Sequence, residues 1–319
     1  MSKYFVTGVS GCIGGWVAKN LVEAGHVVFA LLRNPDKLRK LSLIMKPEDI
    51  AKIKVIEGDI TDLDLLKRVL QESKAQKIIH LAAMQMPFCK KDPALGARVN
   101  VEGTVNVFEA AQAVGLKQVV YSSSTAVYGD ISDYANGEFD HNSPLIPRSF
   151  YGVYKQANEW QAKVYWQDLG ISSIGIRPFV VYGPLRDQGM TSTPTAAIKA
   201  AVKGETYEIS YGGECEFQFA DDVAKIFVAA ADAEFTGAEV YNAGGGTVDM
   251  KRIVDAIGAA IPESKGKITF KDISLPFPRH KDTGAIEKAI GSLTWTSLEE
   301  GIRLSAGYYR NAIVRGEQI

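Results

Sequence analysis

The chain has 319 residues, of which 46% are hydrophobic and 23% charged, and its formal net charge is −1. A chain of this length exceeds the usual single hydrophobic core and predicts a large domain that carries a smaller one. Because the charge is nearly balanced and no run of lysine or arginine occurs, we expect neither a nucleic acid nor an anionic membrane surface as a partner.

The first predicted elements form a strand, a glycine-rich loop and a helix. Residues 3–7 are apolar enough for a buried strand, and Gly8, Gly11 and Gly14 follow at a regular spacing before a helix that turns Trp16 and Leu21 inward. Such glycines allow a tight turn, a close approach to a pyrophosphate and close helix packing. The free amides at the helix start, around Cys12 and Ile13, would face the anion. The loop therefore predicts dinucleotide binding, with a plain strand-to-helix turn as the alternative.

The second predicted strand, residues 26–33, should deliver the residue that reads the adenosine ribose. An acidic residue usually stands there in proteins that bind a free 2′-hydroxyl, and here the strand ends in Leu32, Arg33 and Asn34. Because Arg33 can hold a 2′-phosphate with two hydrogen bonds, we predict NADP rather than NAD. Asp36 leaves the alternative open, since it either caps a helix over 37–41 or swings toward a ribose hydroxyl.

Strands and helices alternate from here on, which predicts a doubly wound parallel (Rossmann) sheet, the α/β fold class, with a smaller α/β carboxyl-terminal domain. Further strands are expected at 54–56, 77–81, 118–121 and 172–176. Asp59 and Ile60 end the third strand, where a carboxylate can accept the adenine amino group. We expect residues 1–178, with 214–243 returning, to form the dinucleotide domain, and 179–213 with 244–319 the substrate domain.

The most informative residues follow the fifth strand. Ser122, Ser123 and Ser124 come at its carboxyl end, where ligands gather in open parallel sheets. Tyr151 and Lys155 stand four residues apart on a predicted helix, so the ammonium can lie beside the phenol and lower its pKa. Tyr151 is therefore a candidate acid/base, although this spacing alone also fits an exposed amphipathic helix.

The sequence shows no targeting segment, membrane span or metal-ligand pattern, which bears on the expected location and metal content of the protein. No secretory signal precedes the first strand and no apolar stretch is long enough to cross a bilayer, so we expect a cytoplasmic protein. Cys12, Cys89 and Cys215 are scattered, which argues against a disulfide framework. Neither they nor the four histidines show the spacing of a metal site, so no metal is expected.

Taken together, these motifs resemble the extended branch of the short-chain dehydrogenases and reductases, which includes the NAD(P)-dependent epimerases and dehydratases of sugars. The resemblance covers nearly the whole chain. It is carried by the glycine loop, Gly58-Asp59-Ile60, His80-Leu81-Ala82-Ala83, Asn100 with Gly103-Thr104, Ser122-Ser123-Ser124, Tyr151 with Lys155, Arg177-Pro178, Val181-Tyr182-Gly183-Pro184, residues 217–224 and 241–246, and residues 297–302.

The resemblance implies an NAD(P)-dependent epimerase or dehydrogenase acting on a hydroxyl-bearing carbon of a sugar or polyol. Tyr151 would exchange the proton, Lys155 would lower its pKa and bind the nicotinamide ribose, and Ser124 would hold the reacting oxygen. The cofactor would be held by Gly8, Gly11, Cys12, Ile13, Gly14, Arg33, Asp59, Ile60, Leu81, Ala82, Ala83, Asn100, Ser122, Tyr151 and Lys155. It also implies a homodimer through the helices at 101–113 and 151–167.

Two departures from the family pattern narrow the function. Dehydratases have Thr-Asp-Glu where this chain has Ser124-Thr125-Ala126, so dehydration is not expected. Family members that act on nucleotide sugars usually have an arginine, which contacts the diphosphate, just before the Asp-Phe or Asp-Tyr of this segment. This chain has Cys215 and Glu216 before Phe217, which weakens the case for a nucleotide-sugar substrate. Arg279 could supply the missing positive charge. The substrate is expected to contact Met84, Ser124 and Thr125.

Two other functions stay open beside the sugar or polyol enzyme. The apolar segment 84–89 also suits an NADPH-dependent reductase of a non-sugar carbonyl. A non-catalytic nucleotide-sensing regulator is the third reading, although such regulators characteristically lose the tyrosine that this chain keeps. The sequence does not identify the substrate.

Overall fold

A seven-stranded parallel sheet forms the centre of the protein. The computed structural model describes residues 1–280, 284–317 and 319. The strand order is β11-β7-β5-β4-β1-β2-β3, and every neighbouring pair is parallel. The strands are β1 (Lys3–Thr7), β2 (Val27–Leu32), β3 (Lys54–Glu57), β4 (Lys77–His80), β5 (Gln118–Ser122), β7 (Ser172–Arg177) and β11 (Ala238–Asn242). The predicted doubly wound parallel sheet is confirmed.

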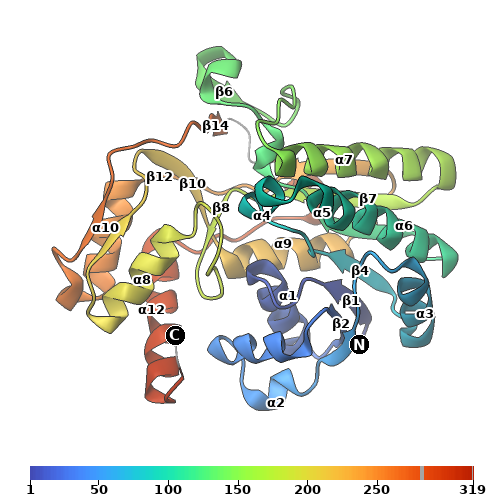
Figure 1. Ribbon diagram of the computed structural model, residues 1–319, viewed down its shortest axis with the longest axis horizontal. Coiled ribbons are helices and arrows are strands. Elements are labelled where there is room, and N and C mark those ends of the chain that lie inside the picture. The colour runs from blue at the N-terminus through green and yellow to red at the C-terminus, as the bar shows by residue number, and fades with distance from the viewer. Residues whose placement is uncertain (281–283, 318) are drawn as a thin grey trace.

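Helices cover both faces of this sheet (Figure 1). On one face lie α1 (Cys12–Glu23) and α9 (Ala220–Asp232), with Trp16 and Phe227 almost completely buried in the larger hydrophobic core. On the other face lie α3 (Leu63–Ser73), α6 (Gly103–Ala113) and α7 (Phe150–Leu169), whose Leu66, Phe108 and Ala162 belong to a second core. The long apolar strand runs of the sequence are thus explained by a sheet that is buried on both sides.

The order of the strands places the ligand crevice. From β1 the chain moves outward through β2 and β3, and from β4 it moves the other way through β5, β7 and β11. The connections after β1 and β4 therefore diverge, and the carboxyl ends of these two strands border the crevice in which open α/β sheets bind ligands. The glycine loop follows β1. Ser122, Ser123 and Ser124 lie at the end of β5, which is the neighbour of β4.

The smaller part of the protein packs beside this crevice. It contains α8 (Thr193–Lys203), α10 (Met250–Ala260) and α12 (Leu298–Val314), which gather on one side of Figure 1. Its strands are β8 (Val180–Tyr182), β10 (Glu214–Phe219) and β12 (Gly246–Asp249) in one sheet, β9 (Tyr207–Ile209) with β13 (Ile268–Phe270) in another, and β6 (Glu138–Phe139) with β14 (Arg279–His280) in a third.

Short helices complete the chain. The helices are α2 (Pro47–Ile50), α4 (Met86–Lys91), α5 (Pro93–Ala97), α11 (Glu287–Ile290), the 3-10 helices η1 (Pro35–Leu43), η3 (Thr125–Val127), η4 (Ile131–Asp133), η5 (Ala135–Gly137) and η6 (Pro262–Ser264), and the π-helix η2 (Arg98–Glu102).

Of the segment 214–243, which we expected to return to the dinucleotide domain, α9 and β11 lie against or within the large sheet. Strand β10 instead lies between β8 and β12 of the small sheet. The assignment of the two parts to cofactor and substrate stays a prediction.

Polar side chains fix where several helices begin. The Ser149 hydroxyl accepts from the amide of Gly152 at 3.1 Å and starts α7 two residues before Tyr151, and Asp62 caps α3. The expected cap at Asp36 is wrong: the side chain of Asn34 accepts from the amide of Asp36 at 2.9 Å. Asparagine readily forms this turn, and Pro35 at the first helical position then sets the backbone angle for η1.

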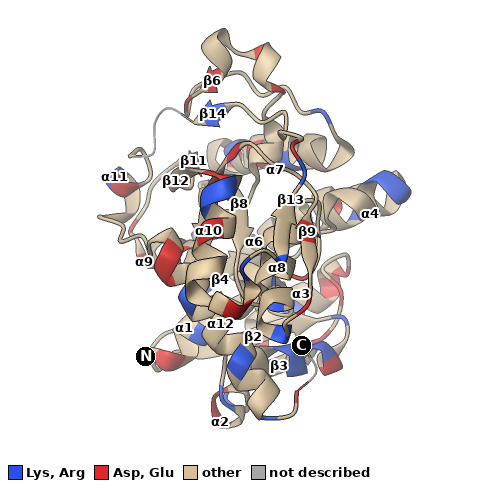
Figure 2. Cartoon of the chain, turned by 90° about the vertical axis from the view of Figure 1, so that its left-hand side faces the viewer, with Lys and Arg blue, Asp and Glu red and all other residues tan. Residues whose placement is uncertain are grey.

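Two surface properties bear on partners. Lysine and arginine are interspersed with aspartate and glutamate over the face shown in Figure 2. Within the described residues, no helix is both long and apolar enough to cross a membrane.

Candidate active site

The glycine loop is shaped by close backbone contacts. Gly8 has a φ of +80°, and a Cβ at this position would lie 2.7 Å from the amide nitrogen of Ala82. A Cβ at Gly14 would lie 2.2 Å from the carbonyl oxygen of Gly8. The helix cap Gly11 has no side chain to occupy the first amides of α1. These amides, next to Cys12 and Ile13, suit the pyrophosphate of a dinucleotide, so the loop fits the cofactor that the sequence predicts.

The residues expected at the adenosine end meet at the sheet edge. Arg33 follows β2 with 64% of its side chain exposed, and its Nε lies 4.0 Å from Oδ2 of Asp59, which follows β3. The other carboxylate oxygen of Asp59 accepts from the amide and hydroxyl of Thr61, both at 3.0 Å. Ile60 next to it is buried. The guanidinium is therefore free to turn outward, and Asp59 is held in place.

The segment after β4 is held to the glycine loop by Thr7. Its hydroxyl accepts from the amides of Leu81 and Ala82 at 3.2 and 3.1 Å, and it lies 2.7 Å from Nδ1 of His80. Burial lowers the pKa of His80 to about 3, so the imidazole stays neutral. Thr7 and His80 thus position Leu81, Ala82 and Ala83 beside Gly8.

The side chain of Asn100 is hydrogen-bonded to the backbone of Met84. Its Oδ1 accepts from the amide of Met84 at 2.7 Å, and its Nδ2 donates to the carbonyl of Met84 at 3.0 Å. Asn100 is only 1% exposed. Its side chain therefore fixes the backbone at Met84, while its predicted direct contact with a cofactor stays a prediction.

Tyr151 and Lys155 both face the end of β5. Nζ of Lys155 donates to the carbonyl of Ser122 at 2.6 Å and lies 5.7 Å from the centroid of the Tyr151 ring. The hydroxyl of Ser124 lies close enough to the phenol of Tyr151 to lower its pKa. The structure thus brings together the three residues that the sequence singles out as catalytic.

The predicted electrostatics of this pair are wrong in one respect. We expected Lys155 to lower the pKa of Tyr151, but burial raises the pKa of this phenol, and the opposing effects come from the bond to Ser124 and the charge of Arg186. Burial also lowers the pKa of Lys155 to about 8. The ammonium binds a backbone carbonyl instead of the phenol, and a charge in a buried site is costly.

Arg186 was missed by the sequence analysis. It lies two residues beyond the Tyr182-Gly183-Pro184 turn, donates to the hydroxyl of Thr191 at 3.2 Å, and its Nε is buried without a hydrogen-bond partner among the described residues. No local pattern marks this arginine. Only the crossing of the chain from β8 into the smaller part brings it to the site.

A cavity of about 350 Å³ opens beside these groups. Ser122, Ser124, Thr125 and Tyr151 line one end, together with Ile13 of the glycine loop. Met84 does not line it and packs instead against the second core, because Asn100 holds its backbone there. The cavity is lined instead by the three residues that follow Met84, namely Gln85, Met86 and Pro87.

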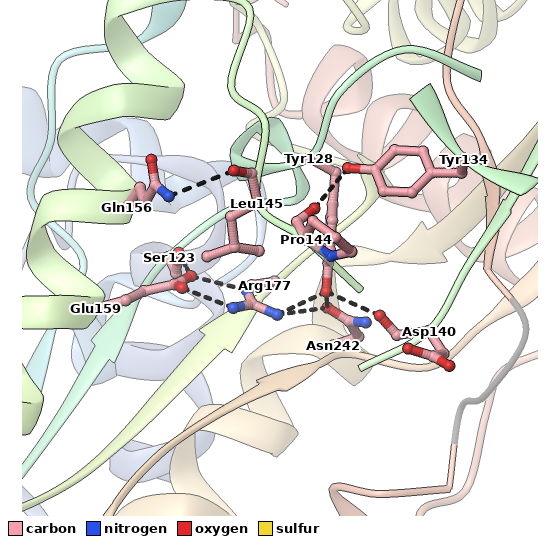
Figure 3. A network of polar contacts seen from close by, with 10 residues as sticks. All are labelled: Ser123, Tyr128, Tyr134, Asp140, Pro144, Leu145, Gln156, Glu159, Arg177 and Asn242. Atoms are coloured by element: carbon pink, nitrogen blue, oxygen red, sulfur yellow. Dashed lines mark hydrogen bonds and ion pairs between the residues drawn. The ribbon is translucent and has the colours of Figure 1, made fainter. Parts of the chain in front are cut away.

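A buried polar network lies behind the catalytic pair (Figure 3). Glu159, one helical turn after Lys155, receives two hydrogen bonds from Arg177 at 2.7 and 2.6 Å and one from the hydroxyl of Ser123 at 2.5 Å. Arg177 also donates to the hydroxyl of Tyr128 at 2.6 Å, which in turn contacts Asn242 at 3.0 Å. The network ties α7 to β5, β7 and β11.

Among the residues that the structure describes, no three histidine, cysteine, aspartate or glutamate side chains are grouped so that they could hold a metal ion.

Comparisons with known proteins agree with this geometry. The sequence model of the NAD dependent epimerase/dehydratase family matches residues 4–244. The UDP-glucose 4-epimerase of Mycolicibacterium smegmatis is 30% identical over 318 residues, which cover 97% of this chain and 99% of that protein.

Two solved structures extend the likeness to the fold. The UDP-glucose 4-epimerase of Thermotoga maritima with UDP-glucose has a TM-score of 0.83 at 22% identity and covers 98% of this chain and 99% of its own. MoeE5 in complex with UDP-glucose and NAD has a TM-score of 0.79 at 26% identity and covers 98% of this chain and 100% of its own. The preference for NADP over NAD finds no support in these comparisons.

The network makes a prediction about stability. Glu159→Gln removes the charge that compensates the buried Arg177, so we expect the free energy of unfolding to fall by about 3 kcal/mol in urea titration. Asp255→Asn breaks the exposed pair between Lys251 and Asp255 and serves as the control, with no measurable change expected. Equal loss in the two variants would contradict a special role of the buried pair.

Proposed function

The chain belongs to the NAD dependent epimerase/dehydratase family, and we propose that it moves a hydride and a proton to or from a hydroxyl-bearing carbon of a sugar or polyol-like substrate. One observation carries the proposal: the phenol of Tyr151 meets the hydroxyl of Ser124 at the cavity, beside the glycine loop and above the ammonium of Lys155. Bound nicotinamide would supply the site that accepts or returns the hydride.

The residues of the chain would do the proton chemistry. Tyr151 takes the proton from the substrate hydroxyl, and Ser124 holds the same oxygen in position. Lys155 holds the end of β5 through the carbonyl of Ser122, and its Nζ lies 5.7 Å from the centroid of the Tyr151 ring. The glycine loop, Arg33 and Asp59 would hold the dinucleotide. Placement of the reacting groups supplies much of the rate.

Epimerisation is favoured over dehydration. Thr125 and Ala126 offer no carboxylic acid beside Ser124 that could expel water. Net oxidation or reduction is the second candidate, and the apolar lining from Met86, Pro87 and Phe179 favours a reductase of a non-sugar carbonyl within that class. A non-catalytic regulator is disfavoured because Ser124, Tyr151 and Lys155 are all present and adjacent.

The preference for NADP rests on Arg33 alone. Its exposed guanidinium follows β2, where we expect the residue that reads the adenosine ribose, and its Nε lies 4.0 Å from Oδ2 of Asp59. NAD is the alternative, and it is the dinucleotide found in the MoeE5 complex.

We propose a homodimer through α7. Phe150, Val153, Trp160 and Val164 are about half exposed and follow one face of this helix at intervals typical of helix packing. Phe88 of the neighbouring α4 extends the apolar surface. A second copy related by twofold symmetry would cover the same stripe on both chains.

Tyr151→Phe tests the catalytic assignment. We expect turnover to fall by about 10²- to 10⁴-fold, because the acid/base is lost. Turnover is followed as epimer formation and as NAD(P)H formation with a panel of sugars, nucleotide sugars and polyols. Tyr154→Phe is the control on the same helix, since its hydroxyl donates to the carbonyl of Pro93 at 2.8 Å. Unchanged turnover in Tyr151→Phe would reject Tyr151 as the acid/base.

Arg33→Ala tests the choice of cofactor. Loss of a charge-assisted contact is expected to weaken NADP binding about tenfold or more and to leave NAD binding unchanged, measured by titration calorimetry. Arg303→Ala, which removes an exposed arginine paired with Glu300 on α12, is the control. Tighter binding of NAD than NADP by the unaltered protein would reject the NADP preference.

Trp160→Glu tests the dimer. A charge in the middle of a self-complementary apolar stripe should reduce the mass in sedimentation equilibrium from two chains to one. Val314→Glu places the same charge on an exposed residue near the end of α12 and should leave the mass unchanged. A single-chain mass for the unaltered protein would reject the dimer outright.

A further inference from the structure

An arginine of the cavity lining, Arg186, keeps hydrogen-bond donors that the described residues do not use. Its Nη2 donates to the hydroxyl of Thr191 at 3.2 Å, whereas its Nε is buried and has no partner in the described structure. The adjacent carboxylate, Asp187, is bound to Lys40 at 2.7 Å. A buried donor without an acceptor is costly, so we expect an oxygen of a ligand to complete this guanidinium.

Arg186 lies at the catalytic end of the cavity. Its positive charge opposes the rise that burial causes in the pKa of Tyr151, and it opposes the same rise for the Cys12 thiol in the glycine loop. Ile13 of that loop also lines the cavity. The guanidinium is therefore close both to the loop that suits the cofactor and to the proposed acid/base, where the sugar carbon has to react.

Gln85 approaches the same place from a distant part of the sequence. Its Oε1 is buried without a hydrogen-bond partner among the described residues, and its side chain lines the cavity. A Cβ at Gly189 would lie 3.0 Å from this Oε1 and 3.2 Å from Nη2 of Arg186. Both side chains thus close on one glycine, and the amide group of Gln85 adds two N–H donors to those of the guanidinium.

The backbone before Arg186 is held in an unusual conformation. Leu185 has a φ of +74°, which is rare and costly for a residue with a branched side chain. Its side chain packs where a Cβ at Gly15 would lie, 2.6 Å from Cδ1, and the preceding carbonyl of Pro184 accepts from Nε1 of Trp16 at 3.1 Å. Such conformations persist where surrounding contacts enforce them, and they cluster at ligand sites. Arg186 is therefore positioned before any ligand binds.

We propose that Arg186 and Gln85 form a subsite for a carboxylate on the sugar itself, so that the protein prefers a uronic acid or similar sugar acid to the corresponding neutral sugar. The inference rests on the proposed function of the same site and narrows its substrate class. A carboxylate accepts two parallel hydrogen bonds from a guanidinium, which a hydroxyl group cannot do. The proposal places no limit on a nucleotide group of the substrate, since the lining also includes Arg148 and Arg279.

Titration of the cofactor-loaded protein with matched acid and neutral sugars tests this preference without turnover. The pairs are UDP-glucuronate with UDP-glucose, and glucuronate with glucose. In the pair that binds more tightly, the acid should bind at least about tenfold more tightly than the neutral sugar, because only the acid offers a charged acceptor. Equal or weaker binding of the acid in that pair, or binding of neither pair, overturns the proposal.

Arg186→Met tests which anion the arginine binds. The ratio of acid to neutral affinity should fall to about one, while the affinities for NAD(P) and for UDP change less than about threefold. Arg186→Lys keeps the charge without the fork of donors and should retain part of the preference. Arg252→Met removes an exposed arginine paired with Glu299 and is the control, with the ratio unchanged. Weaker binding of NAD(P), or of UDP and both nucleotide sugars alike, would assign Arg186 to a phosphate and overturn the proposal.

Gln85→Glu tests the subsite without shortening a side chain. A carboxylate at this position would pair with Arg186, so the affinity for the acid should fall at least about tenfold and that for the neutral sugar should change less than about threefold. Urea unfolding checks that the variant is folded. An unchanged ratio in folded Gln85→Glu would contradict a subsite shared by the two residues.

The outcomes separate this inference from the proposed reaction. Binding of the acid does not require proton transfer, so full activity in Tyr151→Phe would overturn the assigned acid/base and leave the preference for the acid to be decided by titration. Loss of the expected preference, in turn, overturns the carboxylate subsite and leaves the reaction class standing.

Discussion

The active site depends on the burial of one ion pair, Glu159 with Arg177. Removing two charges from water is costly, and the cost is offset here because the guanidinium donates to both oxygens of Glu159 and to the hydroxyl of Tyr128. The carboxylate also accepts from Ser123. These contacts therefore hold α7 against β5, β7 and β11. The turn of α7 that precedes Glu159 presents Lys155 and Tyr151 to the end of β5.

Burial, more than the neighbouring lysine, governs the acid/base chemistry of the cleft. The phenol of Tyr151 and the ammonium of Lys155 both lose hydration, which raises the pKa of the first and lowers that of the second. Each shift favours the neutral form. The hydroxyl of Ser124 and the charge of Arg186 oppose the shift of the phenol, so these two groups favour the phenolate.

The lining of the cavity is chemically mixed. It includes the hydroxyls of Ser122 and Ser124, the guanidinium of Arg186 and the carboxyl groups of Glu214 and Glu216 on β10. Apolar side chains such as Phe179 also line it. The likeness to enzymes of UDP-sugars covers the sequence family and the fold.

The sequence by itself determined the features that depend on local patterns of residue types. Apolar periodicity and the glycine spacing sufficed for the strands and the phosphate loop, because each depends on residues close together in the chain. The set of Ser124, Tyr151 and Lys155 followed from the resemblance to a known family. The tertiary structure alone decided that Met84 turns away from the cavity, that Lys155 binds a carbonyl, and that Arg186 and Glu216 face the cleft. Those outcomes depend on contacts between segments far apart in sequence, whose burial and direction no local pattern encodes.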